Sequence, residues 1–216
     1  MIIAMGLFPK FTALDLVGPY QVFASMPGVQ VVLCAEKPGM VTDDNGLIEI
    51  QVDNAFDEVA EPDIVVIPGG QGARDEARAH GPIVDWVAAT HPTTRWTSSV
   101  CTGSLILAAA GLLNGVHATT HWCFYDELAS HGAIPSDQRV VMNNRVATAA
   151  GVSAGIDLAL TLVGEVESPT MAQAIQLGIE YDPRPPFDSG SPSKADPELR
   201  DLVFALMTRP GQWTPG

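Results

Sequence analysis

A cysteine stands between a predicted strand and a predicted helix, and this junction constrains the fold more than any other segment. Residues 95–100 predict a buried strand that ends at Cys101. Residues 102–113, rich in alanine and leucine, predict a helix that starts directly afterwards. Gly103 and Ser104 are small, so this helix can begin close behind the strand. A thiol at such a corner points out of the sheet, as in a nucleophile elbow with cysteine in place of serine.

Two interpretations of Cys101 are open at this point. A free cysteine is often an inert residue of the hydrophobic core. Next to a helix N-terminus, however, the partial positive charge of the helix favours the thiolate, which is the reactive form. The strand–cysteine–helix context favours the functional interpretation.

Strands alternate with helices along the chain, which predicts a doubly wound, mostly parallel α/β sheet sandwiched by helices, of the flavodoxin-like kind. Strands are expected at 2–8, 29–35, 47–52 (an edge strand), 64–67 and 95–100, with a hairpin at 140–148 that turns at Asn143 and Asn144. Helices are expected at 16–25, 73–79, 83–90, 102–113, 121–131, 152–166, 169–179 and 197–207. Ligands of such sheets bind beyond the carboxyl ends of the strands. We therefore expect the loop Pro68-Gly69-Gly70 to lie beside Cys101.

The chain has 216 residues, enough for one large domain with a hydrophobic core. We assign residues 1–181 to this α/β domain. From residue 182 onward proline, glycine and serine are frequent. Residues 182–216 are therefore expected to form a C-terminal arm that packs on the domain or on a dimer partner.

Charge and composition exclude several classes of function. The net charge of −14 argues against binding to nucleic acid or to an anionic membrane surface. No apolar run reaches the ~18 residues that span a bilayer. The three cysteines are widely spaced without a CxxC pair, and the first residues lack a basic signal segment, so a cytoplasmic location is expected. The five histidines are dispersed, so no metal site is expected.

Four further residues are candidates for the site. Asp15 lies among apolar residues, where it is either a helix N-cap or a buried acid whose pKa is raised and which carries a proton. The N–H groups of Gly70 and Thr102 could form an oxyanion-hole-type pocket, although a glycine pair is also common in plain turns. His121 is either a base for Cys101 or a structural residue at a helix start, with Thr120 as the N-cap.

Asp15, the Pro68-Gly69-Gly70 loop and Cys101 together resemble the DJ-1/PfpI superfamily, whose fold is class I glutamine amidotransferase-like. The segments 14–19, 99–104, 118–122, 155–157 and 186–192 resemble its bacterial isocyanide hydratase branch. The early acid of that branch is aspartate, whereas glutamate is usual in the superfamily. Thr102 follows the cysteine where many protease-like and deglycase-like relatives have histidine. Residues 147–153 are richer in alanine than the branch leads us to expect.

The resemblance implies a cofactor-independent hydro-lyase that hydrates a small isocyanide, R–N≡C, to an N-substituted formamide. Cys101 would attack the terminal carbon, Asp15 would transfer the proton, and water would add to the resulting thioimidate. Thr102, with the N–H groups of Gly70 and Thr102, would orient and stabilise the intermediates. The resemblance also implies a homodimer.

Three other functions stay open on the sequence. The first is a glyoxalase or deglycase activity on α-oxoaldehydes, which Thr102 and Asp15 disfavour. The second is a ligand-sensing domain like that of AraC-type transcription regulators, which the acidic charge disfavours. The third is a redox-sensing cysteine.

Overall fold

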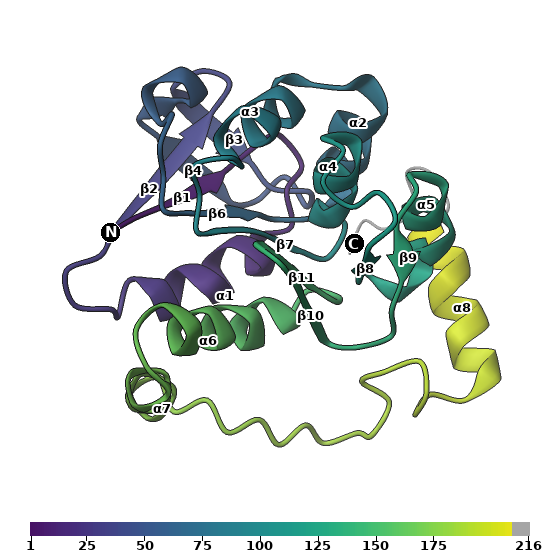
Figure 1. Ribbon diagram of the computed structural model, residues 1–216. Helices are drawn as coiled ribbons and strands as arrows, with labels where there is room; N and C mark the ends of the chain where they lie inside the picture. The colour runs from purple at the N-terminus through teal and green to yellow at the C-terminus, as the bar shows by residue number, and fades with distance from the viewer. Residues whose placement is uncertain (209–216) are drawn as a thin grey trace.

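A central sheet of seven strands organises the protein, which we describe over residues 1–208 of a computed structural model (Figure 1). The strand order is β10-β11-β7-β6-β1-β2-β5. These strands are β1 (Ile2–Gly6), β2 (Gln30–Ala35), β5 (Asn54–Ala55), β6 (Ile64–Ile67), β7 (Trp96–Val100), β10 (Val140–Asn143) and β11 (Val146–Ala149). β10 runs antiparallel to β11, and all the other neighbours are parallel. The predicted, mostly parallel α/β sheet is therefore confirmed.

Helices cover both faces of this sheet, as Figure 1 shows. One face carries α1 (Ala13–Phe23) and α6 (Ala154–Val166), with α7 (Pro169–Gly178) packed against α6. The opposite face carries α2 (Gln71–Ala79), α3 (Pro82–Thr90) and α4 (Gly103–Ala109). The remaining helices are α5 (Tyr125–Ser130) and α8 (Pro197–Thr208). Within residues 1–208, no helix has both the length and the apolar character needed to cross a membrane.

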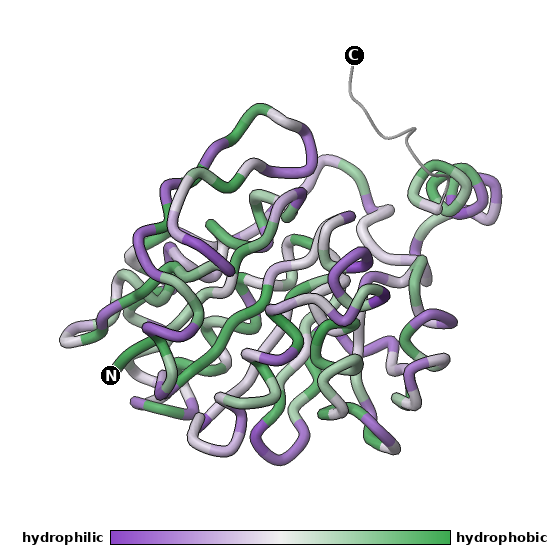
Figure 2. Tube along the Cα trace, turned by 90° about the horizontal axis from the view of Figure 1, so that it is seen from above, coloured by the Kyte–Doolittle hydropathy of each residue, from purple (hydrophilic) through white to green (hydrophobic). Residues whose placement is uncertain are grey.

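Burial of the strands on both faces explains their composition. All four residues of β6 are buried, and four of the five in β1 are buried as well. Strands of a parallel sheet are covered by helices on both sides, so nearly continuous apolar runs are favoured there. Figure 2 shows hydrophobic segments passing through the middle of the molecule and hydrophilic loops around its rim.

Several predicted elements differ from the observed ones. The segment expected as an edge strand at 47–52 forms β4 (Glu49–Val52), which pairs with β3 (Gly39–Thr42) in a separate two-stranded sheet; β5 and β10 are the edges of the main sheet. The helix expected at 102–113 stops at Ala109, because Gly111 adopts a φ of +80° that a helix cannot continue. The helix expected at 121–131 consists of the short 3-10 helix η2 (Trp122–Phe124) followed by α5. A further small sheet, β8 (His117–Ala118) with β9 (Ile134–Pro135), had no counterpart in the predicted elements.

The elbow requires a residue without a side chain at the start of α4. A Cβ placed on Gly103 would lie 2.4 Å from the carbonyl oxygen of Ile67 and 2.6 Å from that of Pro68. Any side chain there would push α4 away from the end of β6. Glycine thus allows the helix to begin directly behind the sheet, two residues after Cys101.

The segment after α7 crosses the molecule to reach α8 beside α5 (Figure 1). No residue of α8 is buried, and the ring of Phe204 lies 6.3 Å from the ring of Trp122 between centroids. Figure 2 shows α8 standing off the main body. The division of the chain at residue 181 stays a prediction, and residues 209–216 of the proposed arm lie outside the described part.

Candidate active site

Cys101 occupies a strained backbone position between β7 and α4. Its φ is +54°, a left-handed value that residues with a side chain seldom adopt. The N–H of Cys101 is shared between the carbonyl oxygens of Ala149 (3.1 Å) and Ala150 (3.0 Å). Its own carbonyl accepts from the hydroxyls of Thr120 (3.0 Å) and Ser104 (3.1 Å). These hydrogen bonds hold the strained turn in place, as expected where strain of about 1–3 kcal/mol is kept at a functional position.

Three candidate groups meet around Gly69. A Cβ on this glycine would lie 2.6 Å from the Thr102 nitrogen, 2.7 Å from Asp15 Oδ2 and 2.8 Å from the Cys101 Cβ. The expected proximity of the Pro68-Gly69-Gly70 loop to Cys101 is therefore confirmed. The loop follows β6, Cys101 follows β7, and these parallel strands end at the same edge of the sheet.

Asp15 is a buried acid and not a helix cap. Thr12 holds the N-cap position of α1, and the Asp15 carboxylate accepts instead from the Gly69 N–H at 2.8 Å through Oδ2. Oδ1 has no hydrogen-bond partner in residues 1–208. The side chain is fully buried, and this burial raises the pKa of Asp15 to about 7 despite the opposing hydrogen bonds from Gly69 and Cys101. The carboxyl is therefore protonated in a large share of molecules near neutral pH.

Burial also dominates the chemistry of the Cys101 thiol. It raises the pKa of Cys101, and the nearby Asp15 carboxylate raises it further. Hydrogen bonds from the N–H groups of Val152 and Thr102 lower this pKa, but by less than burial raises it. The expectation that the helix N-terminus favours a resting thiolate is thus wrong, because α4 has only seven residues and desolvation outweighs its dipole. Since the thiol keeps its proton and the carboxyl titrates near neutrality, the Cys101–Asp15 pair holds between one and two protons near pH 7 and one proton above it.

Thr102 connects the elbow to the glycine loop. Its hydroxyl accepts from the Gly70 N–H at 2.9 Å and donates to the Gly70 carbonyl at 3.0 Å. Gly70 has a φ of +126°, and a Cβ there would lie 2.4 Å from the Lys10 carbonyl oxygen, so only glycine fits. The Gly70 N–H proposed as an oxyanion donor is therefore occupied by Thr102, whereas the Thr102 N–H bonds to the Cys101 side chain.

Val152 is a residue of the site that the sequence does not reveal. Its N–H hydrogen-bonds to the Cys101 side chain, and its φ is +24°. A β-branched residue is not expected at positive φ, so no local pattern predicts this role. The only signal is its place in the alanine-rich segment 147–153, which begins within β11 and continues beyond its end.

His121 lies close to the site but bonds elsewhere. Its Nδ1 accepts from the Cys123 N–H at 3.4 Å, and no hydrogen bond between His121 and Cys101 is found in the described chain. Burial lowers the pKa of His121 to about 4, which keeps the imidazole neutral. The predicted N-cap at Thr120 is wrong, because His121 caps η2 and the Thr120 hydroxyl donates to Cys101.

A cavity of about 330 Å³ adjoins the elbow. Its walls include His121, Trp122, Tyr125 and residues 150–153, with Gly190, Ser191 and Pro192 from the segment after α7. The alanine-rich stretch thus does line a cavity, through Ala150. Within residues 1–208, no group of three or more His, Cys, Asp or Glu side chains is arranged to hold a metal ion.

Replacement of Thr102 by valine should destabilise the protein. Thr102→Val removes the partner of the buried Gly70 N–H and C=O, which costs about 2 kcal/mol in free energy of unfolding, whereas Thr102→Ser keeps the hydroxyl and costs less. Urea denaturation of both variants measures the difference. Equal stability of the valine and serine variants would contradict the bridging role.

The raised pKa of Asp15 predicts that the free energy of unfolding falls as the pH rises. A carboxyl with a folded-state pKa of about 7, against an ordinary value of 3.8, favours folding fully below pH 4 and loses this contribution as pH rises through 7. Relative to Asp15→Asn, the wild type should therefore lose up to about 4 kcal/mol in free energy of unfolding between pH 4 and pH 8. Urea denaturation at both pH values tests this, with Asp201→Asn on exposed α8 as the control. A constant difference between wild type and Asp15→Asn would refute the raised pKa.

Comparison with known proteins places this arrangement in a family. The DJ-1/PfpI family profile matches residues 1–165. An isonitrile hydratase from Pseudomonas putida is 43% identical over 201 residues, which cover 90% of this chain and 85% of the relative. A deglycase from Pyrococcus abyssi is 29% identical over 136 residues, covering 62% of this chain and 80% of the relative. The crystal structure of a THiJ/PfpI family protein from Pseudomonas syringae superposes with a TM-score of 0.90 at 39% identity, covering 95% of this chain and 85% of the other. With its strained cysteine elbow and this extent of similarity, the chain belongs to the DJ-1/PfpI family.

Proposed function

We propose that this protein is an isocyanide hydratase that converts R–N≡C and water to the N-substituted formamide R–NH–CHO. The observation that carries the proposal is the buried Asp15 carboxyl, with a pKa raised to about 7, beside the thiol of Cys101. An acid of this kind can deliver a proton to carbon at neutral pH. The 43% identity to the isonitrile hydratase of Pseudomonas putida supports the same substrate class, since isonitrile and isocyanide denote one functional group.

The first half of the reaction forms a covalent intermediate. The reactive form of the Cys101–Asp15 pair carries one proton, which moves from the thiol to the Asp15 carboxylate as the sulfur attacks. The Cys101 thiolate forms a C–S bond to the terminal carbon of the isocyanide. Asp15 protonates the same carbon, which yields the thioimidate R–N=CH–S–Cys101 and leaves Asp15 as a carboxylate.

The second half returns both groups to their initial state. A water molecule adds through oxygen to the thioimidate carbon; one of its protons goes to the nitrogen and the other to Asp15. The C–S bond then breaks as the C=O bond forms, releasing R–NH–CHO and the Cys101 thiolate. Asp15 thus acts first as an acid and then as a base, and no other group has to supply or keep a proton.

We infer that the groups around the sulfur stabilise it as charge changes. The N–H groups of Val152 and Thr102 already hydrogen-bond to the Cys101 side chain, and they favour the thiolate that leaves in the last step. Thr102 positions Gly70 through two hydrogen bonds. For the Gly70 N–H to serve as a donor to an intermediate, the Thr102 hydroxyl has to release it.

Formamide production from a simple aryl or alkyl isocyanide tests the proposal directly. Cys101→Ala should reduce the rate to the uncatalysed level, because no covalent intermediate can form. Asp15→Asn should lower kcat at least about 100-fold, as expected for removal of a general acid–base group. Cys34→Ala, a matched control at a buried cysteine of β2, should keep activity.

Two results of this assay would overturn the proposal. One is an inactive wild type on several isocyanides combined with turnover of methylglyoxal, which would indicate the deglycase-type reaction instead. The other is full activity of Cys101→Ala, which would exclude the covalent route.

We further propose a homodimer. The exposed side of α1 carries Leu14, Val17 and Tyr20, each more than two-fifths exposed, and α8 exposes Leu202 and Phe204. Exposed apolar residues grouped on one helix, as on α1 and separately on α8, are typical of interaction surfaces. Light scattering at micromolar concentration should give twice the monomer mass of 22.8 kDa; a monomer mass would refute the dimer.

A further inference from the structure

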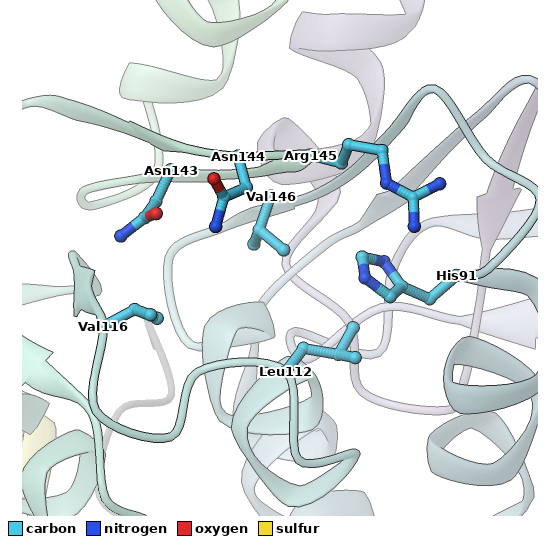
Figure 3. Close-up of a pocket in the computed structure, with 7 residues that line it drawn as sticks. All are labelled: His91, Leu112, Val116, Asn143, Asn144, Arg145 and Val146. Atoms are coloured by element: carbon cyan, nitrogen blue, oxygen red, sulfur yellow. The ribbon is translucent and has the colours of Figure 1, made fainter.

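A second cavity lies at the end of the sheet opposite to Cys101. It is bounded by the turn between β10 and β11, by His91 directly after α3, and by the segment after α4 (Figure 3). Val146, which lines it, is the first residue of β11, so the cavity sits at the amino ends of the parallel strands. Cys101 lies beyond their carboxyl ends. The reaction proposed above makes no use of this cavity.

The size and walls of this cavity suit a small molecule with an apolar body. Its volume is about 250 Å³. Cavities of about 150 Å³ hold benzene, and drug-sized ligands need about 300 Å³ or more. The apolar side chains of Leu112, Val116 and Val146 face the space between them (Figure 3). One six-membered ring with one small polar group fills such a volume.

Arg145 supplies hydrogen-bond donors to this space. Its Nη1 donates to the carbonyl oxygens of Pro92 (3.0 Å) and Thr94 (3.1 Å), which fixes the guanidinium beside His91 (Figure 3). Within residues 1–208, Arg145 forms no ion pair, and the described lining contains no acidic side chain. The Nε and Nη2 hydrogens are thus available to an oxygen acceptor.

The hydrogen bonds around His91 fix its tautomer. The Thr94 hydroxyl donates to the His91 carbonyl at 3.0 Å, because a carbonyl can only accept. At the 2.9 Å contact between the Thr94 and Thr97 hydroxyls, Thr97 must therefore be the donor. At the 2.9 Å contact between Thr97 Oγ1 and His91 Nδ1, the proton must then be on Nδ1. Burial and the nearby Arg145 lower the pKa of His91, so the ring is neutral near pH 7 and Nε2 is left as an acceptor. The ring points into the cavity (Figure 3).

The two groups together define the ligand. A neutral imidazole acceptor requires an N–H or O–H donor, whereas the guanidinium requires an oxygen acceptor. A carboxylate can accept from the guanidinium but has no hydrogen to donate to Nε2. The lone pair of Nε2 would then face the negative charge of the carboxylate. A carboxamide meets both, through its carbonyl oxygen and its N–H. The side-chain amides of Asn143 and Asn144 at the same rim also offer one donor group and one acceptor each.

We propose that this cavity binds a small carboxamide, with the carbonyl oxygen on Arg145, the N–H on His91 Nε2 and the apolar substituent between Leu112, Val116 and Val146. The N-substituted formamide product of the proposed hydration carries the same pair of groups. That extension to the product rests on the proposed function, whereas the carboxamide site does not.

Benzamide and benzoate form a matched pair of probes, because they share a ring and a carbonyl and differ in the amide N–H. Benzamide should shift the backbone amide NMR signals of residues 91–94, 112–116 and 143–146 in a saturable way at millimolar concentration. Benzoate should bind there at least tenfold more weakly. Both measurements use the wild-type protein and require no isocyanide turnover, so their failure and the failure of the proposed function are distinguishable.

Two variants test the cavity in different ways. Val116→Trp fills it, and Arg145→Gln removes the guanidinium; each should weaken benzamide binding at least tenfold. Arg95→Gln, an exposed arginine at the same end of the sheet that does not line the cavity, is the control and should leave binding unchanged. Benzamide shifts confined to the surroundings of Cys101, tighter binding of benzoate, or unchanged affinity in both cavity variants would each overturn the proposal.

Discussion

The contact of the buried Asp15 carboxyl with the Gly69 N–H is the interaction on which the site depends. It joins α1 to the loop after β6, directly beside the elbow after β7. Burial makes the carboxyl hold its proton near neutrality, and the same burial raises the pKa of the Cys101 thiol. A water-accessible site would let both groups titrate independently. The low-dielectric setting instead couples them, so that a proton lost by one is most readily taken by the other.

Much of this arrangement can be predicted from the sequence, because it depends on residue patterns within short segments of the chain. Strands buried on both faces have nearly continuous apolar runs, so β1 and β6 are visible in the residues themselves. Their parallel arrangement brings Gly69 and Cys101 to one edge of the sheet, although 31 intervening residues separate them. Asp15 is detectable because a carboxylate among apolar residues is unusual. Thr102 is visible directly after the cysteine, although its bridge to Gly70 is not.

What cannot be predicted depends on contacts between distant segments. The pairing of β4 with β3, and not with the main sheet, is decided by tertiary packing, since the alternation of residues 47–52 suits either sheet. The effect of burial on Cys101 outweighs the helix dipole, and burial is invisible in a local pattern. The cavity at His91 is formed by a helix end, a hairpin turn and the segment after α4, so no contiguous sequence motif predicts it.

The positive φ of Cys101 has a consequence for how this site can change over evolution. The cost of that angle belongs to the backbone, and alanine or serine in place of cysteine would bear it equally. Loss of the sulfur in such variants therefore brings no relief of strain, whereas glycine would relieve the strain and give up the reaction. Stability and reactivity oppose each other at a single dihedral angle, and retention of cysteine in this turn requires selection for what the thiol does.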